Sequence, residues 1–350
     1  MKAAVWYAKE DIRVEDFPEP QPASGEVKVK IKTCGICGSD IHEYREGPFI
    51  IPSRPHPLTG RQGAPVILGH EFSAEIVEVG EGVTGFEVGD RVTQNALIYC
   101  GECPYCKRGE YNMCLKLGTV GFAWDGAFAE YAILKDYGLL KLPDAVTDDI
   151  GAFAEPVAVA VRAVKRSRLA IGDTVAIVGA GPIGLLVMQV CRAAGASKIF
   201  VVEPMASRRE LAKKLGANYV FDPTQVDVGK EIAKLTDGLR VNKAFECVGN
   251  QAAFDTTVKV TGRRAVICVA GLALKPIQVP FARLWGHEKE ITFCTGYEDE
   301  YPAAMAFLED KRVDVESLIS DRIKLDDLVE KGIKPLMTEP DKHMKILVYP

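Results

Sequence analysis

The sequence predicts an α/β plus β fold, in which a β-rich body is interrupted by an inserted domain with a doubly wound parallel sheet. Residues 1 to 155 contain short apolar segments separated by glycines and prolines, a spacing typical of β-rich domains. From Asp173 onward strand and helix patterns alternate, which predicts a parallel sheet covered by helices on both faces. After residue 295 the pattern is mixed again, so we expect the chain to return to the first domain.

We expect the first domain over residues 1–155 and 296–350, and the inserted domain over residues 156–295. A helix is predicted over 152–168, because the proline in Glu155-Pro156 suits a first helical turn. In the first domain, strands are predicted at 27–31, 72–79, 90–93 and 345–349. In the inserted domain, strands are predicted at 174–178, 198–202, 243–247, 265–269 and 291–294, and helices at 183–194 and 207–215.

The composition disfavours several classes of protein. A chain of 350 residues is long enough for two domains, and its 47% hydrophobic residues can fill two cores. It has no run of about 18 apolar residues that would predict a membrane span. Its net charge is −5, whereas nucleic-acid-binding domains present a basic face. We therefore expect a small-molecule partner, neither nucleic acid nor membrane, and, because residues 1–6 show no targeting signal, a cytoplasmic location.

A dinucleotide-binding fingerprint lies at the start of the alternating region. Gly179, Gly181 and Gly184 form the pattern G-x-G-x-x-G, with Pro182 and Ile183 between the last two glycines. A predicted strand precedes the pattern and a predicted helix follows it, which makes a weak pattern specific. The glycines permit the tight turn, the approach of the pyrophosphate to the backbone and close helix–strand packing. The alternative is a related domain that no longer binds a nucleotide.

Glu203, at the end of the second predicted strand of this region, indicates which nucleotide is bound. A carboxylate there accepts hydrogen bonds from the adenosine ribose hydroxyls and repels a 2′-phosphate, so we expect NAD rather than NADP. Arg208 and Arg209 follow and could receive a phosphate, although such arginines more often begin a solvated helix face. Arg208 is included among the candidate cofactor-binding residues.

Four closely spaced cysteines form the most specific metal-binding motif of the chain. They are Cys100, Cys103, Cys106 and Cys114, and thiolates at such spacing converge on one tetrahedral ion with Zn–S distances of about 2.3 Å. Iron–sulfur clusters also use two-residue spacings, but the seven-residue gap before the last cysteine favours zinc. Four thiolates leave no open coordination position, so this zinc is expected to be structural.

A second set of candidate ligands is spread over three fragments of the first domain. Each fragment is ambiguous alone, because the cysteines match a redox pair, the histidine a core residue and the last glutamate a helix cap. The fragments are Cys34-Gly-Ile-Cys37-Gly-Ser39-Asp40-Ile-His42, Gly69-His70-Glu71 and Ala154-Glu155-Pro156.

In this order, the fragments resemble the zinc-containing medium-chain alcohol and polyol dehydrogenases, and the resemblance covers essentially the whole chain. It also includes Val-Gly-x-Gly-Val at 79–83, Val-Gly-Asp-Arg-Val at 88–92, the four-cysteine lobe and the glycine fingerprint. One departure is Ala74, which replaces the last glycine of Gly-His-Glu-x-x-Gly and should alter local packing only. The resemblance implies a GroES-like β-barrel catalytic domain with its zinc lobe at 100–114, an inserted Rossmann domain and an active cleft between them.

The resemblance further implies a catalytic zinc held by Cys37, His70 and Glu155, with the fourth position open to water or substrate. Glu71 is then expected beside the metal as an outer carboxylate or a transient ligand. Cys34 is expected to be a buried neighbour. The expected cofactors are therefore two zinc ions per chain, one catalytic and one structural, and NAD.

The implied reaction is hydride transfer between NAD(H) and a small secondary alcohol or ketone. Zinc at the alcohol oxygen lowers the pKa of that oxygen, and the nicotinamide accepts the hydride. Ser39 follows Cys37 closely enough for its hydroxyl to reach the reacting oxygen. His42 is a candidate relay toward solvent, because an imidazole has an ordinary pKa of about 6.5. The alternatives are a turn serine and a surface histidine.

The substrate and assembly are also inferred from resemblance. The segment 47–60 and Gly296-Tyr297 look like the 2,3-butanediol dehydrogenase branch, which interconverts acetoin and butanediol. A sorbitol-type polyol dehydrogenase is the alternative, because some butanediol enzymes lack the cysteine lobe. A zinc-free quinone or enone reductase is disfavoured by the three zinc ligands together, and a nucleic-acid-binding zinc ribbon by the net charge. We expect a homodimer or homotetramer that pairs through an edge strand at 291–295.

Overall fold

The structure is a computed structural model that describes residues 1–350, and the chain divides into two compact units. The first unit contains Met1–Glu155, Ala304–Glu309 and Leu318–Pro350, and the second contains Pro156–Ala303 and Asp310–Ser317. Residues 296–303 and 310–317 therefore lie in the second unit. Ion pairs of Arg162 with Glu298 and of Lys165 with Asp299, at 2.5 Å each, tie the first of these segments to that unit.

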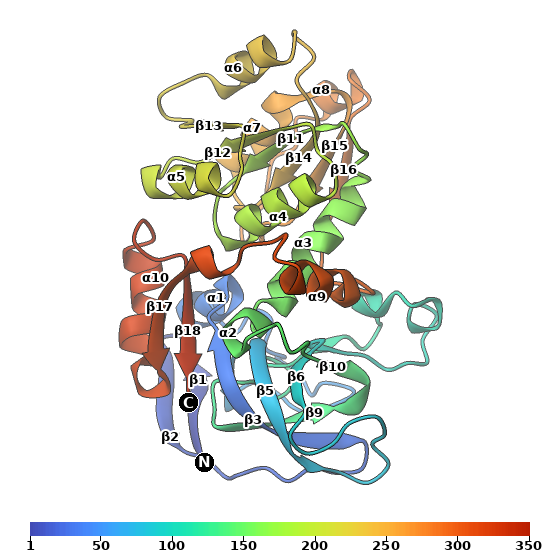
Figure 1. Cartoon of the computed structure of the whole chain (residues 1–350), viewed down its shortest axis with the longest axis vertical. Helices are drawn as coiled ribbons and strands as arrows, with labels where there is room; N and C mark the ends of the chain where they lie inside the picture. The colour runs from blue at the N-terminus through green and yellow to red at the C-terminus, as the bar shows by residue number, and fades with distance from the viewer. The chain divides into compact units, whose positions relative to one another are not determined.

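Two sheets of the first unit hold most of its strands (Figure 1). One sheet has the order β2-β1-β4, and the other has the order β10-β6-β5-β3-β18-β17, with β9 also paired to β3. The strands are β1 (Lys2–Ala8), β2 (Asp11–Asp16), β3 (Glu26–Gly35), β4 (Val66–Ile67), β5 (Glu71–Val79), β6 (Arg91–Gln94), β7 (Leu97–Ile98), β8 (Gly118–Thr119), β9 (Tyr131–Lys135), β10 (Leu139–Lys141), β17 (Ile319–Lys324) and β18 (Lys345–Tyr349). The helices are α1 (Gly38–Glu46), α2 (Asp148–Gly151), the π-helix η6 (Leu328–Ile333) and α10 (Lys334–Thr338).

The pairing of β3 positions the candidate metal site. β3 runs antiparallel to β5, with Gly35 opposite Glu71, and antiparallel to β18, with Leu347 opposite Gly35. The segment after β3, the start of β5 and the start of β18 therefore meet at one end of this sheet. Alternate side chains of β3, such as Val27, Val29 and Ile31, are buried in the core beneath it.

The second unit is a parallel sheet with helices on both faces. Its strand order is β13-β12-β11-β14-β15-β16, and every neighbouring pair is parallel. This order reverses direction at β11, which is the arrangement of dinucleotide-binding doubly wound sheets. The strands are β11 (Thr174–Val178), β12 (Lys198–Val202), β13 (Tyr219–Phe221), β14 (Val241–Glu246), β15 (Thr261–Val269) and β16 (Glu290–Phe293). The helices are α3 (Ala154–Ser167), α4 (Pro182–Ala193), α5 (Ala206–Lys214), α6 (Val228–Leu235), α7 (Gln251–Val260), α8 (Phe281–Trp285) and α9 (Tyr301–Glu309), of which α3 and α9 extend into the first unit.

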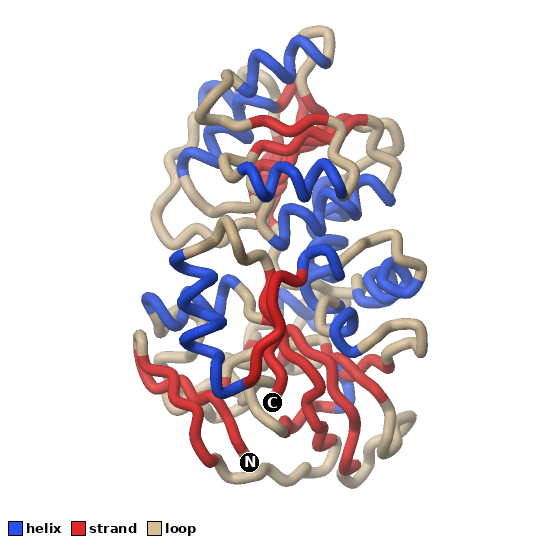
Figure 2. Tube along the Cα trace, turned by 60° about the vertical axis from the view of Figure 1, so that its left-hand side comes forward, coloured by secondary structure: helices blue, strands red, loops and turns tan.

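The predicted elements of the alternating region agree with the structure within a few residues. Figure 2 shows the strands of this region in red and the helices that cover them in blue. Strands β11 and β12 match the predicted ranges, and α4 and α5 begin one residue earlier than predicted. The strand β13 and the helices α6 and α7 are additional elements that complete the sheet and its covering layers. None of the helices combines the length and the apolar character needed to cross a bilayer.

Candidate functional site

Three candidate metal-binding side chains come together in the first unit. Cys37, His70 and Glu71 each offer one ligand atom, and these atoms lie within 4.8 Å of one another. Cys37 is the N-cap residue of α1, two residues after the end of β3. Glu71 is the first residue of β5, and His70 directly precedes it. The register of β3 with β5 thus joins fragments that are distant in sequence.

Asp40 and Ser39 flank the two ring nitrogens of His70. The Nδ1 atom lies 3.6 Å from Asp40 Oδ1, and both atoms are buried without a hydrogen-bond partner. The Nε2 atom lies 3.4 Å from Ser39 Oγ. Burial alone would lower the pKa of His70, but Asp40 and Cys37 raise it well above its ordinary value. A carboxylate behind one ring nitrogen is the usual outer partner of a metal-ligating histidine.

Lys345 is a further partner of this cluster, and no motif of the sequence predicted a role for it. Its Nζ donates to Glu71 Oε2 at 2.5 Å and to the carbonyl oxygen of Ile36 at 3.0 Å, and both side chains are buried. Burial opposes its charge, yet Glu71 and Cys37 raise the pKa of Lys345, so it stays a cation. The available signal was a lysine beginning an otherwise apolar predicted strand.

Glu155 lies in the first turn of α3 and is buried. Its charge contributes to the raised pKa of His70. The ligand atoms that lie within 4.8 Å of one another, however, belong to Cys37, His70 and Glu71 and do not include Glu155. Burial and the charge of Glu71 raise the pKa of Cys37. The acidic groups around His70 outnumber the single cation Lys345, and a divalent cation would offset this excess. Thiolate, imidazole and carboxylate donors fit zinc.

His42 lies on α1 near Ser39, but no hydrogen bond joins the two side chains. It is half-buried, its Nδ1 atom has no hydrogen-bond partner, and burial together with Arg45 lowers its pKa. A proton path from Ser39 to His42 therefore requires a further group between them.

The four cysteines of the lobe also converge. The Sγ–Sγ distances are 3.5 Å for Cys103–Cys106, 3.5 Å for Cys100–Cys114 and 4.0 Å for Cys100–Cys106. A tetrahedral zinc site with Zn–S bonds of about 2.3 Å has S–S edges of about 3.8 Å. Hydrogen bonds from the backbone of Cys106 and Leu115 lower the pKa of Cys103 to about 6, which favours its thiolate. The lobe fits a closed structural site.

The glycine fingerprint of the second unit borders a cavity of about 440 Å³. Its lining includes Gly179, Gly181, Glu203 and Arg208, whereas Pro182 and Ile183 form the first turn of α4. A Cβ atom on Gly184 would lie 1.9 Å from the carbonyl oxygen of Gly179, so the helix can pack here only with glycine.

Glu203 is buried and faces the glycine loop. Its Oε2 accepts a hydrogen bond from Ala180 N at 2.8 Å, and its Oε1 accepts one from Met205 N at 3.0 Å. The carboxylate is therefore fixed at the carboxyl end of β12, beside the strand-order reversal where such sheets bind their ligand.

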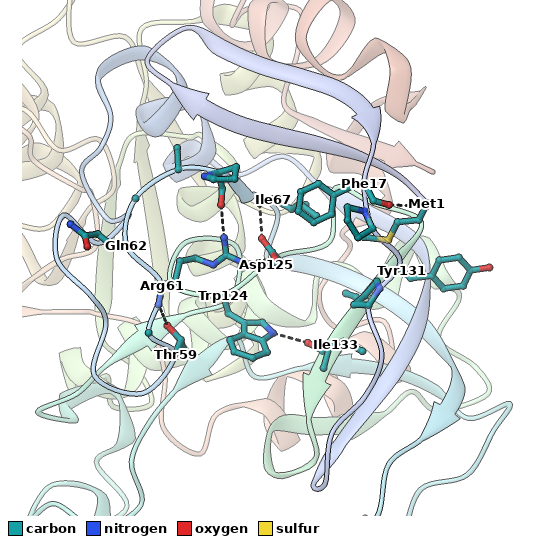
Figure 3. A pocket seen from close by; sticks show the side chains of 17 residues that line it. Met1, Phe17, Thr59, Arg61, Gln62, Ile67, Trp124, Asp125, Tyr131 and Ile133 are labelled. Atoms are coloured by element: carbon teal, nitrogen blue, oxygen red, sulfur yellow. Dashed lines mark hydrogen bonds and ion pairs between the residues drawn. The ribbon is translucent and has the colours of Figure 1, made fainter.

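A separate cavity of about 480 Å³ lies in the first unit (Figure 3). Trp124 and Ile133 form part of its wall, where the indole Nε1 donates to the carbonyl oxygen of Ile133 at 3.0 Å. The ion pair of Arg61 with Asp125 lies on another part of the wall. None of the predicted metal ligands lines this cavity.

Comparisons with known proteins agree with this architecture. Residues 23–144 match the alcohol dehydrogenase GroES-like domain, and residues 182–310 match the zinc-binding dehydrogenase family. The (R,R)-butanediol dehydrogenase of Bacillus subtilis is 41% identical, with 100% of both chains covered. A sorbitol dehydrogenase of Halalkalibacterium halodurans is 38% identical over 88% of this chain and 87% of its own.

A solved structure shows the same likeness in three dimensions. The crystal structure of 2R,3R-butanediol dehydrogenase from Bacillus subtilis superposes with a TM-score of 0.93 at 40% identity, covering 100% of this chain and 99% of that chain. The predicted GroES-like and Rossmann architecture is thereby confirmed. The chain belongs to the zinc-binding dehydrogenase family and is an oxidoreductase of the alcohol dehydrogenase type.

Proposed function

We propose that the protein is a zinc- and NAD-dependent dehydrogenase that interconverts 2,3-butanediol and acetoin. The observation that carries the metal assignment is the cluster of half-buried Cys37 with buried His70 and Glu71, with Asp40 behind the histidine. Glu155 completes the proposed ligand set as the third protein ligand. Zinc, when bound, supplies a Lewis acid that makes an alcohol oxygen more acidic.

The chain's own residues orient the ligands and move protons. Asp40 directs the Nδ1 side of His70, which leaves Nε2 for the metal. Lys345 holds Glu71 by an ion pair, so this carboxylate stays beside the ligands. The Ser39 hydroxyl, 3.4 Å from His70 Nε2, is the proposed first acceptor of the substrate proton, and His42 is the proposed group nearer solvent.

The nucleotide site is proposed to bind NAD through the glycine loop and Glu203. The loop presents the first turn of α4 to the pyrophosphate, and Glu203 is available to the adenosine ribose. Arg208, which lines the same cavity, is the proposed contact for the nucleotide near that ribose.

The choice of a vicinal diol rests on the similarity to (R,R)-butanediol dehydrogenases, at 41% and 35% identity over 100% of this chain. A sorbitol-type polyol dehydrogenase is the second candidate, because two sorbitol dehydrogenases follow at 38% and 33% identity. The test is NAD-linked oxidation of each 2,3-butanediol stereoisomer beside sorbitol, threonine and simple secondary alcohols, with and without a chelator. Chelator-sensitive activity that is highest on one butanediol isomer supports the proposal. Higher activity on sorbitol supports the second candidate, a sorbitol-type polyol dehydrogenase.

We also propose a homodimer or homotetramer in the cytoplasm. Strand β16 is an edge of the parallel sheet, since it pairs only with β15. Three large apolar side chains at or near this edge are exposed: Phe281 (74%), Trp285 (76%) and Phe293 (63%). An exposed edge with such side chains favours pairing with a second copy. Light scattering on the purified protein measures the mass, and a monomer contradicts the proposal. A cytoplasmic location is supported by the ten cysteines, none of which forms a disulfide, since a reducing compartment keeps thiols reduced.

A further inference from the structure

Two consecutive arginines of α5 have different surroundings in the second unit. Arg208 lines the nucleotide cavity, whereas Arg209 is absent from its lining. Arg209 Nη1 donates to the carbonyl oxygens of Glu203 at 2.7 Å and of Pro204 at 2.5 Å. The same atom lies 3.1 Å from Asp222 Oδ2. The guanidinium is therefore held against the backbone of the turn that follows β12.

Asp222 is fixed by contacts that do not depend on Arg209. It directly follows β13, and its Oδ1 accepts hydrogen bonds from Thr224 N at 2.9 Å and from Thr224 Oγ1 at 2.6 Å. The hydrogen bonds from Thr224 and the charge of Arg209 lower the pKa of Asp222, so it is ionised at neutral pH. The next residue, Pro223, lines the nucleotide cavity. A fixed negative charge thus stands at the rim of the cavity.

The charges at this rim are balanced. Two carboxylates, Glu203 and Asp222, accompany two arginines, Arg208 and Arg209. A 2′-phosphate adds two negative charges to a ribose and is bound in proteins by guanidinium groups that are free to face it. Asp222 pairs with one such guanidinium group, that of Arg209, and its own negative charge near the cavity repels a phosphate.

We propose that Asp222 is a specificity-determining residue, which excludes NADP by retaining Arg209 behind the turn that follows β12. The proposal rests on the proposed function, in which this cavity binds the adenosine end of NAD. The discrimination between NAD and NADP then depends on the pair of Asp222 and Arg209 as well as on Glu203.

The test measures NADH and NADPH binding to the full-length protein by nicotinamide fluorescence. Asp222→Asn keeps an oxygen for the two hydrogen bonds from Thr224 and removes the charge that faces Arg209. We expect the NADPH dissociation constant to fall about tenfold, and that of NADH to change less than about threefold. Asp222→Asn combined with Arg209→Gln should return the NADPH constant to that of the unmodified protein.

Asp227→Asn is the matched control. Asp227 also pairs with a cation, Lys259 at 2.8 Å, and also accepts a backbone hydrogen bond that an asparagine keeps, from Lys230 N at 3.1 Å. Neither Asp227 nor the residues next to it in the chain line the nucleotide cavity, whereas Pro223, next to Asp222, does, so both dissociation constants should be unchanged.

Three results would overturn the inference: an unchanged NADPH constant in Asp222→Asn, an equal shift for both nucleotides, or the same NADPH gain in Asp227→Asn. The first two indicate that the pair only supports the turn, and the third indicates an effect of net charge. An unmodified protein that binds neither nucleotide refutes the proposed function and this inference together, which distinguishes the two failures.

Discussion

The two candidate metal centres of the first unit are built in opposite ways. The lobe takes four identical ligands from residues 100–114, and its short turns bring them together locally. The cluster of Cys37, His70 and Glu71 takes unlike side chains from two segments, which meet only because β3 pairs with β5, and its proposed third ligand, Glu155, comes from α3. The lobe is closed by four thiolates, whereas the cluster depends on outer partners such as Asp40 and Lys345. The proposed structural centre is thus local, whereas the proposed catalytic centre depends on the pairing of strands in the sheet.

The largest expected effect is at the cluster itself. Cys37→Ala removes a proposed zinc ligand, and we expect activity to fall at least about a thousandfold. Metal analysis should show zinc falling from two to one per chain, because the lobe is independent of β3. Two zinc ions per chain in the Cys37→Ala variant would contradict the assignment of Cys37.

Lys345 provides the next test, because it is buried with Glu71. Lys345→Met leaves a buried carboxylate without its cation, and we expect a loss of about 3–5 kcal/mol in the free energy of unfolding. Urea denaturation measures this loss. The double variant Lys345→Met/Glu71→Gln serves as the control. It should recover most of the stability, since it removes the unpaired charge. A double variant as unstable as the single one would show that Lys345 acts by packing alone.

Asp40 probes the outer partner of the histidine. Asp40→Asn keeps the size of the side chain and removes the charge that faces His70 Nδ1. Zinc affinity at the cluster should weaken by about 10–100-fold. Competition with a chelator of known affinity measures it, and the lobe zinc in the same sample provides the internal reference. Equal weakening of both zinc ions would point to a general loss of structure.

The smallest effect on catalysis is expected at the lobe. Cys103→Ser breaks the closed thiolate set, so one zinc per chain and part of the thermal stability should be lost. Activity per folded molecule at low temperature should stay within about twofold, because an all-thiolate site offers no position for substrate. The melting temperature and the specific activity of the same preparation separate the effect on stability from the effect on catalysis. A loss of activity as large as that of Cys37→Ala would show that the two centres do not differ in function.

The same contrast explains what could be predicted from the sequence. The lobe and the glycine fingerprint are contiguous motifs, and the structure brings their residues together as the spacing indicates. The strands β11 and β12 were predictable because buried parallel strands are continuous apolar runs. Strand β13 has only three residues, too few to give a periodic signal.

The partnership of Lys345 with Glu71 could not be predicted, because it depends on the pairing of β18 with β3 across most of the chain. Asp40 lies inside the fragment from Cys34 to His42, but its role depends on the orientation of the His70 ring, which only the fold determines. The ion pair of Asp222 with Arg209 similarly requires β12 and β13 to be neighbours in the sheet.

The place of Lys345 in the last strand has a consequence for synthesis on the ribosome. Glu71 emerges early, whereas the cation that neutralises it is translated 274 residues later. The buried ion pair can therefore form only after β18 has left the ribosome. A chain truncated before β18 would leave Glu71 without its partner, so β18 has to be translated before the centre can be assembled.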